Sequence, residues 1–178
     1  MFNVNNPPVT TRQLESFVAA IATEVDNVHP DLDPAQGAFL LAVGDAGSIL
    51  MVASPAVDPA TTAHIDRLFA PRRRLAAIVS ATGWAPHVDA PVSLAWVVVA
   101  VGIGGVPACV AVRRVLEDEQ WTLIEPHEIP WFAASSAGAL RAQLETGKPL
   151  RWKETRSPEL HQRPDELPTP PVDEKGEL

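Results

Sequence analysis

The strongest pattern in the chain is a series of apolar bursts between residues 75 and 124. Valine, isoleucine, leucine and tryptophan dominate each burst, and glycine, proline or charged residues fill most of the breaks. β-Branched and aromatic residues favour strands, and short glycine-containing breaks are typical of hairpin turns. The first burst also fits a helical continuation, and we favour a strand there. The pattern therefore predicts strands over residues 75–79, 93–101, 106–112 and 121–124.

A second strand pair is predicted nearer the N-terminus. Apolar residues 39–43 and 49–53 flank the glycine-rich segment 44–48. Two such runs joined by a loop of about five residues are typical of an antiparallel hairpin. We therefore expect these residues to form two further strands of the same sheet.

The clearest helix lies near the N-terminus. Thr10 is followed three residues later by Gln13, which is the spacing of a helix capping box. The helix should end near Asn27, because the residue before Pro30 disfavours the helical conformation. Apolar residues recur at helical spacing along this segment, namely Leu14, Phe17, Val18, Ile21 and Val25.

Two further helices are predicted. Asp58 followed by Pro59 is a typical helix start, and Pro71 should stop that helix. Its expected buried stripe consists of Ile65, Leu68 and Phe69. The last helix should follow residues 131–132. Its expected features are a cap at Ser135 or Ser136, the inward-facing pair Leu140 and Leu144, and a terminal Gly147.

This order of elements predicts an α+β fold. We expect an antiparallel sheet of about five or six strands, built from two hairpins and a meander, with the helices mainly on one face. The helices are N-terminal, middle and C-terminal. Residues 1–152 form the predicted single globular domain. Residues 153–178 are proline-rich and charged with little apolar content, which predicts a flexible tail.

Composition narrows the class of protein. The 178 residues carry a formal net charge of −8, which counts against non-specific nucleic-acid binding. The single cysteine, Cys109, requires no oxidising compartment, and the N-terminus has no signal-peptide pattern, so we expect a cytoplasmic protein. Glycines at residues 102, 104 and 105 interrupt the longest apolar window, which argues against a membrane span.

The candidate catalytic chemistry is sparse. The glycine turn that begins at Gly102 lacks the third glycine of a dinucleotide loop, and a strand follows it, so a hairpin turn is the favoured interpretation. The acidic pair at residues 31 and 33 fails the calcium-loop template. His87 and Asp89 form the best nucleus for a metal site, although loop histidines are more often solvated. The residues that would have to join them are His29, Asp31, and His64 with Asp66.

Three other features have a functional and a structural interpretation. Arg72, Arg73 and Arg74 form the one basic cluster, which fits a phosphate or acidic ligand but also a solvated helix end. Cys109 lies among apolar neighbours, which favours an inert core thiol over a nucleophile. Trp131 and Trp152 flank the last predicted helix and are candidates for a partner-facing edge.

Three functional hypotheses follow. We favour a non-enzymatic binding or accessory protein that associates with itself or with another protein, without a cofactor. The second is a small metal-dependent hydrolase that uses His87 and Asp89, joined by His29, Asp31 or His64. The third is a nucleic-acid-associated regulator that uses the Arg72 to Arg74 cluster.

Overall fold

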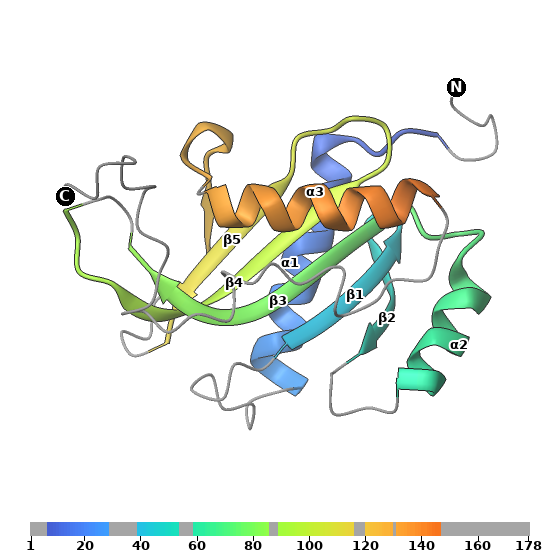
Figure 1. The fold of residues 1–178 in the computed structure, drawn as a ribbon, viewed down its shortest axis with the longest axis horizontal. Coiled ribbons are helices and arrows are strands. Elements are labelled where there is room, and N and C mark those ends of the chain that lie inside the picture. The colour runs from blue at the N-terminus through green and yellow to red at the C-terminus, as the bar shows by residue number, and fades with distance from the viewer. Residues whose placement is uncertain are drawn as a thin grey trace, which may run out of the picture.

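A six-stranded antiparallel sheet with strand order β2-β1-β3-β4-β5-β6 forms the centre of the computed structural model (Figure 1). The structure describes residues 7–28, 39–53, 59–85, 89–115, 120–129 and 131–146. The predicted boundary between domain and tail lies outside them. The strands are β1 (Phe39–Asp45), β2 (Ser48–Ala53), β3 (Leu75–Trp84), β4 (Ser93–Gly102), β5 (Cys109–Arg114) and β6 (Thr122–Ile124). The helices are α1 (Thr11–Val28), α2 (Pro59–Phe69), the short 3-10 helix η2 (Pro126–Glu128) and α3 (Trp131–Thr146).

The α+β class, the antiparallel sheet and the three predicted helices are confirmed. The prediction that helices cover mainly one face is wrong, because α1 and α3 pack on opposite faces and create two apolar cores (Figure 1). The central strand β4 is buried on both sides from Ala95 to Gly102. A strand with two buried faces has a continuous apolar sequence instead of an alternating one. Residues 95–101 have that composition.

The hairpin between β1 and β2 is tighter than predicted. Asp45 pairs with Ser48, so only two residues form the turn, and both have positive φ: Ala46 at 51° and Gly47 at 94°. Two-residue turns with positive φ at both positions match the twist of antiparallel strands. The expected loop of about five residues therefore shortens, and part of it joins the strands.

The N-terminus of α1 has the predicted capping box. The Thr10 N–H donates to Gln13 Oε1 at 3.0 Å, and the Gln13 N–H donates to Thr10 Oγ1 at 3.1 Å. The preceding segment is tied to the sheet, because the Val9 N–H donates to the Ile103 carbonyl at 3.0 Å. Gly102 makes room for this contact, since a Cβ there would lie 2.8 Å from the Val9 side chain.

The other two helices differ from prediction in detail. Leu68 of α2 is 65% exposed, so it does not belong to the buried stripe; Asp66 is buried instead. The helix lies beside the edge strand β2, where only a narrow stripe can face the sheet (Figure 1). The predicted cap at Ser135 or Ser136 is wrong, because α3 already begins at Trp131. Burial of Ala133 against the sheet accounts for the extra turn. Among the described residues, no helix combines the length and apolar content that crossing a bilayer requires.

Candidate functional site

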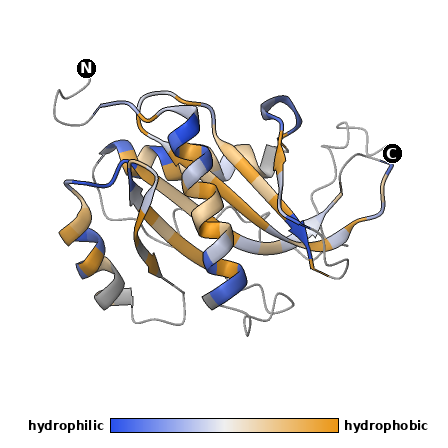
Figure 2. Cartoon of the chain, turned by 180° about the vertical axis from the view of Figure 1, so that it is seen from behind, coloured by the Kyte–Doolittle hydropathy of each residue, from blue (hydrophilic) through white to orange (hydrophobic). Residues whose placement is uncertain are grey.

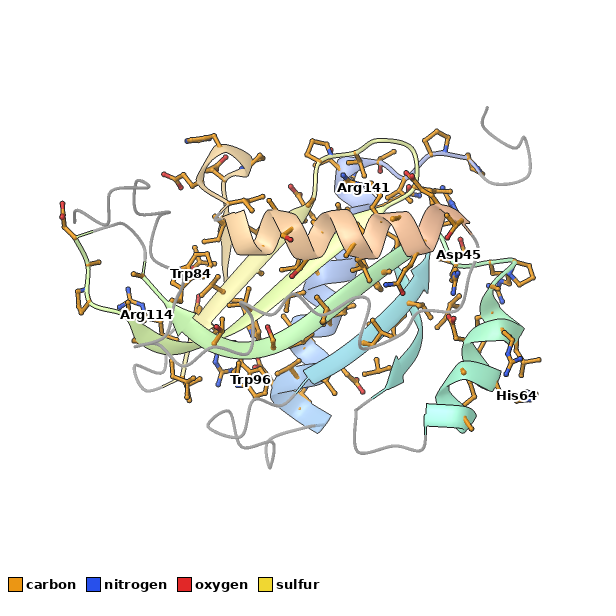
Figure 3. The ribbon with its side chains drawn as sticks, viewed as in Figure 1. Asp45, His64, Trp84, Trp96, Arg114 and Arg141 are labelled. Carbon is orange, nitrogen blue, oxygen red and sulfur yellow. The ribbon has the colours of Figure 1, made fainter. Side chains whose placement is uncertain are left out.

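The residues predicted to bind a metal do not gather in the described part of the chain. His64 is exposed on the outer side of α2 (Figure 3). Asp89 is exposed in the connection between β3 and β4. Asp66 is buried and paired with Arg73. His29, Asp31 and His87 lie outside the described residues. Within the described ranges, no three histidine, cysteine, aspartate or glutamate side chains form a group able to hold a metal ion.

The arginine cluster faces largely inward. Arg73 is 1% exposed, and its Nη1 donates to Asp66 Oδ2 at 2.6 Å. Arg74 donates to the Pro7 carbonyl from Nε at 3.0 Å and from Nη2 at 2.6 Å, which holds the N-terminal segment in place. Arg72 is 66% exposed and lies 3.7 Å from Asp45. All three guanidinium groups thus have partners within the chain, and Arg72 alone of the three is largely exposed to solvent.

The tryptophans have different environments. Trp84 and Trp96 are buried in opposite cores (Figure 3). Trp131 begins α3, but its side chain and the whole of Trp152 lie outside the described residues. Trp121, which the sequence analysis did not single out as a site residue, is half-buried beside α1.

The candidate functional site is a groove between α1 and the β5–β6 edge of the sheet, which we call the α1–β6 groove. It consists of two neighbouring hollows of about 170 Å³ and 240 Å³. Glu15 and Leu123 line both hollows. The first is otherwise lined by Val18, Ala19, Ala22, Ala111, Trp121 and Thr122. The second is otherwise lined by Thr11, Leu14, Pro107, Ala108, Cys109, Ile124, Glu125 and Pro126.

The groove results from the shortness of β6 and from small side chains around it. Leu123 pairs with Ala111 of β5, which directs it to the face of the sheet that α1 covers. Figure 2 shows the molecule from the side of this helix. Helix α1 does not cover it, so Leu123 remains 50% exposed. Alanines on α1 and β5 leave space where larger side chains would close the gap. Strand β6 has a neighbour on one side only, so its outer edge carries no further strand of the described sheet.

A polar cluster fixes one wall of the groove. Asp26 near the end of α1 forms an ion pair with Arg113 of β5. The Trp121 Nε1–H donates to the same carboxylate, at 3.0 Å from Oδ2 and 3.2 Å from Oδ1. Because one carboxylate receives both donors, α1, β5 and the start of β6 are held together, and the indole keeps its place beside the first hollow.

The groove combines apolar walls with negative charge. Glu15 and Glu125 are exposed at its rim, and no lysine or arginine belongs to its lining among the described residues. Burial raises the pKa of the Cys109 thiol to about 11, and the negative charge of Glu15 contributes to the increase. The thiol is therefore protonated at neutral pH, which removes its nucleophilic form.

We expect Cys109 to react slowly with thiol reagents in the folded protein. At pH 8, a pKa of about 11 leaves roughly one thiol in a thousand ionised, against about a quarter for a free cysteine. The rate of alkylation at pH 8 should therefore be about 250-fold lower in the folded protein than in denaturant, and should rise steadily above pH 9. This rate is measured at several pH values by quenching the alkylation reaction at successive times and quantifying the labelled protein by mass spectrometry. Equal rates in folded and denatured protein would contradict the prediction.

Comparison with known protein families, curated proteins and solved structures finds no match to this chain. The functional argument therefore rests on the geometry of the α1–β6 groove. Sequence reasoning missed the groove because it treated residues 121–124 only as a strand. The one available signal was an apolar Leu123 in a strand that is short and lies at the end of the meander.

Proposed function

We propose that this protein is a non-enzymatic binding protein that acts through protein–protein association, and that the α1–β6 groove holds an extended apolar segment of a partner protein. The observation that carries the proposal is Leu123, which is 50% exposed between two small hollows beside the outer strand of the sheet. Large exposed aliphatic side chains within a hollowed apolar surface are typical of interaction sites.

The size of the hollows favours side chains over a small molecule. Ligand pockets usually measure about 300–1,000 Å³, and both hollows, at about 170 Å³ and 240 Å³, are smaller. A cavity of about 150 Å³ holds a group the size of benzene. Each hollow therefore suits one large apolar side chain.

The position of the hollows favours an extended segment. A peptide that adds to a sheet edge gains main-chain hydrogen bonds, and pockets beside the edge select its alternate side chains. Strand β6 supplies such an edge, and Leu123 separates two hollows on the same face of the sheet. A second copy of this chain is the alternative occupant of the groove, and the experiment below distinguishes it from a separate partner protein. A cytoplasmic location remains part of the proposal, because one cysteine needs no oxidising compartment.

We expect Leu123→Asp to lower the affinity for such segments at least tenfold, because it places a charge where an apolar side chain should pack. The test begins with selection of random displayed peptides, about ten residues long, on the full-length protein. Binding of the enriched peptides to wild-type and variant protein is then measured by fluorescence anisotropy. Leu68→Asp is the matched control, because Leu68 is more exposed than Leu123 and lies on α2.

The proposal predicts that the selection enriches peptides with apolar residues two positions apart. These peptides should bind the wild-type protein and Leu68→Asp but not Leu123→Asp. Binding that survives Leu123→Asp, or no enrichment at all, would contradict it. Circular dichroism of both variants checks that the fold is intact. Light scattering addresses a second copy: a dimer that Leu123→Asp dissociates would make another copy of the chain the occupant, and would overturn the proposal of a separate partner.

A further inference from the structure

We infer that the partner segment carries a lysine or arginine beside its apolar side chains, and that Glu15 and Glu125 receive this basic group at the rim of the second hollow. The inference rests on the proposed function, because it specifies the chemistry of the segment that the α1–β6 groove holds. It begins from the placement of the two carboxylates on opposite walls, one on α1 and one directly after β6.

Glu15 is exposed at the rim, where the two hollows meet. It lines both hollows, and its negative charge contributes to the raised pKa of Cys109, which lines the second hollow. Glu125 lines that same hollow from the opposite side, next to Pro126. A basic side chain that passes between α1 and the end of β6 would therefore have a carboxylate on either side.

The protein does not neutralise these carboxylates itself in the described part of the chain. The ion pairs there use Asp26, Asp45 and Asp66, and none uses Glu15 or Glu125. Arg113 beside the groove pairs with Asp26, and Arg141 of α3 donates to the Val106 carbonyl at 3.1 Å (Figure 3). Arg12 lies one helical turn before Glu15 on α1, and none of the ion pairs among the described residues joins these two side chains. Two unpaired carboxylates on an apolar groove disfavour an acidic segment and favour a basic one.

A specific contact with Glu15 and Glu125 must be distinguished from the general attraction of a basic peptide to an acidic protein. The net charge of −8 speeds the approach of any basic peptide, and salt screens that effect. A specific contact predicts more: removal of the charge of Glu15 or of Glu125 should weaken binding, whereas removal of one negative charge elsewhere should not. Glu145 is the matched control, because it is exposed on α3, which covers the opposite face of the sheet.

The experiment uses the displayed-peptide selection with the full-length protein, followed by anisotropy measurements on Glu15→Gln, Glu125→Gln, the double variant and Glu145→Gln. We expect the enriched peptides to contain a lysine or arginine next to the apolar pair. Each single change should lower the affinity about three- to fivefold and the double change about tenfold, while Glu145→Gln has no effect beyond about 1.5-fold. Raising the salt from about 50 mM to about 500 mM should weaken wild-type binding more than binding by the double variant.

Failure of this inference is distinguishable from failure of the proposed function. Peptides without basic residues, whose binding depends on Leu123 but not on Glu15 or Glu125, would overturn the inference and leave the groove as a binding site. Equal losses in Glu15→Gln, Glu125→Gln and Glu145→Gln would also overturn it, because each removes one negative charge and only net charge would then matter. Binding that is insensitive to Leu123→Asp would overturn both.

Discussion

Replacement of Asp66 by alanine is expected to lower the free energy of unfolding by about 3–5 kcal/mol. Asp66 is 0% exposed and Arg73 is 1% exposed, and their contact of 2.6 Å links α2 to the start of β3. Removal of the carboxylate leaves the buried Arg73 guanidinium without the negative charge that balances it, which is strongly unfavourable away from water. Urea denaturation followed by circular dichroism measures the loss. A change below about 1 kcal/mol would contradict this account of the pair.

A double-variant cycle separates the cost of an orphaned charge from the value of the pair. Arg73→Met should also destabilise the protein, because it leaves the Asp66 carboxylate buried without its main partner. The combined change Asp66→Leu with Arg73→Met should restore much of the stability, since apolar replacement of both partners is often neutral or favourable. Arg72→Met is the control, because Arg72 is 66% exposed and should change stability by no more than about 0.5 kcal/mol.

The parts of the fold that could be predicted from the sequence depend on residues that are close to one another along the chain. The capping box of Thr10 and Gln13 is a contact between residues three positions apart, and it forms as predicted. The strand bursts and the breaks between them likewise depend on neighbouring residues. The β4–β5 hairpin around Gly104, which has φ of 97°, follows from such a break.

The parts that the sequence did not predict depend on contacts between distant residues. The sequence placed Asp66 with His64 among the candidate metal-site residues and Arg73 in a basic cluster, and only the packing of α2 and α3 against the sheet buries the two together. A strand that is buried on both faces has an unbroken apolar sequence, and β4 has such a sequence. The prediction that helices lie mainly on one face did not take this into account.

The candidate site was the least predictable part. Of the predicted site residues, Arg73 and Arg74 bind groups within the chain, and Trp131 and Trp152 have no described side chain. The groove depends on how far α1 extends over β6, which no local pattern determines. Leu123 becomes exposed because its strand has only three residues at the edge of the sheet.

Replacement of Phe17 by alanine is expected to destabilise the protein by about 3–5 kcal/mol, because Phe17 is fully buried where α1 crosses the sheet. Its ring lies on Gly44 so closely that a Cβ there would be 2.6 Å from the ring and 2.5 Å from the Ser48 carbonyl oxygen. The cavity cannot collapse readily, since the ring rests on strand backbone. Ser16→Ala, a change at the exposed neighbouring position, is the control and should alter stability by less than about 0.5 kcal/mol.

The Phe17→Ala change also tests whether α1 determines the shape of the groove. Phe17 anchors α1 to the sheet, while Glu15, Val18 and Ala19 of that helix line the groove. Under conditions where the protein stays folded, Phe17→Ala should therefore weaken binding of the selected peptides. Asp66→Ala should leave their affinity unchanged, because α2 lies beside β2 at the opposite edge of the sheet. Equal losses in both folded variants would show that binding follows overall stability and not the position of α1.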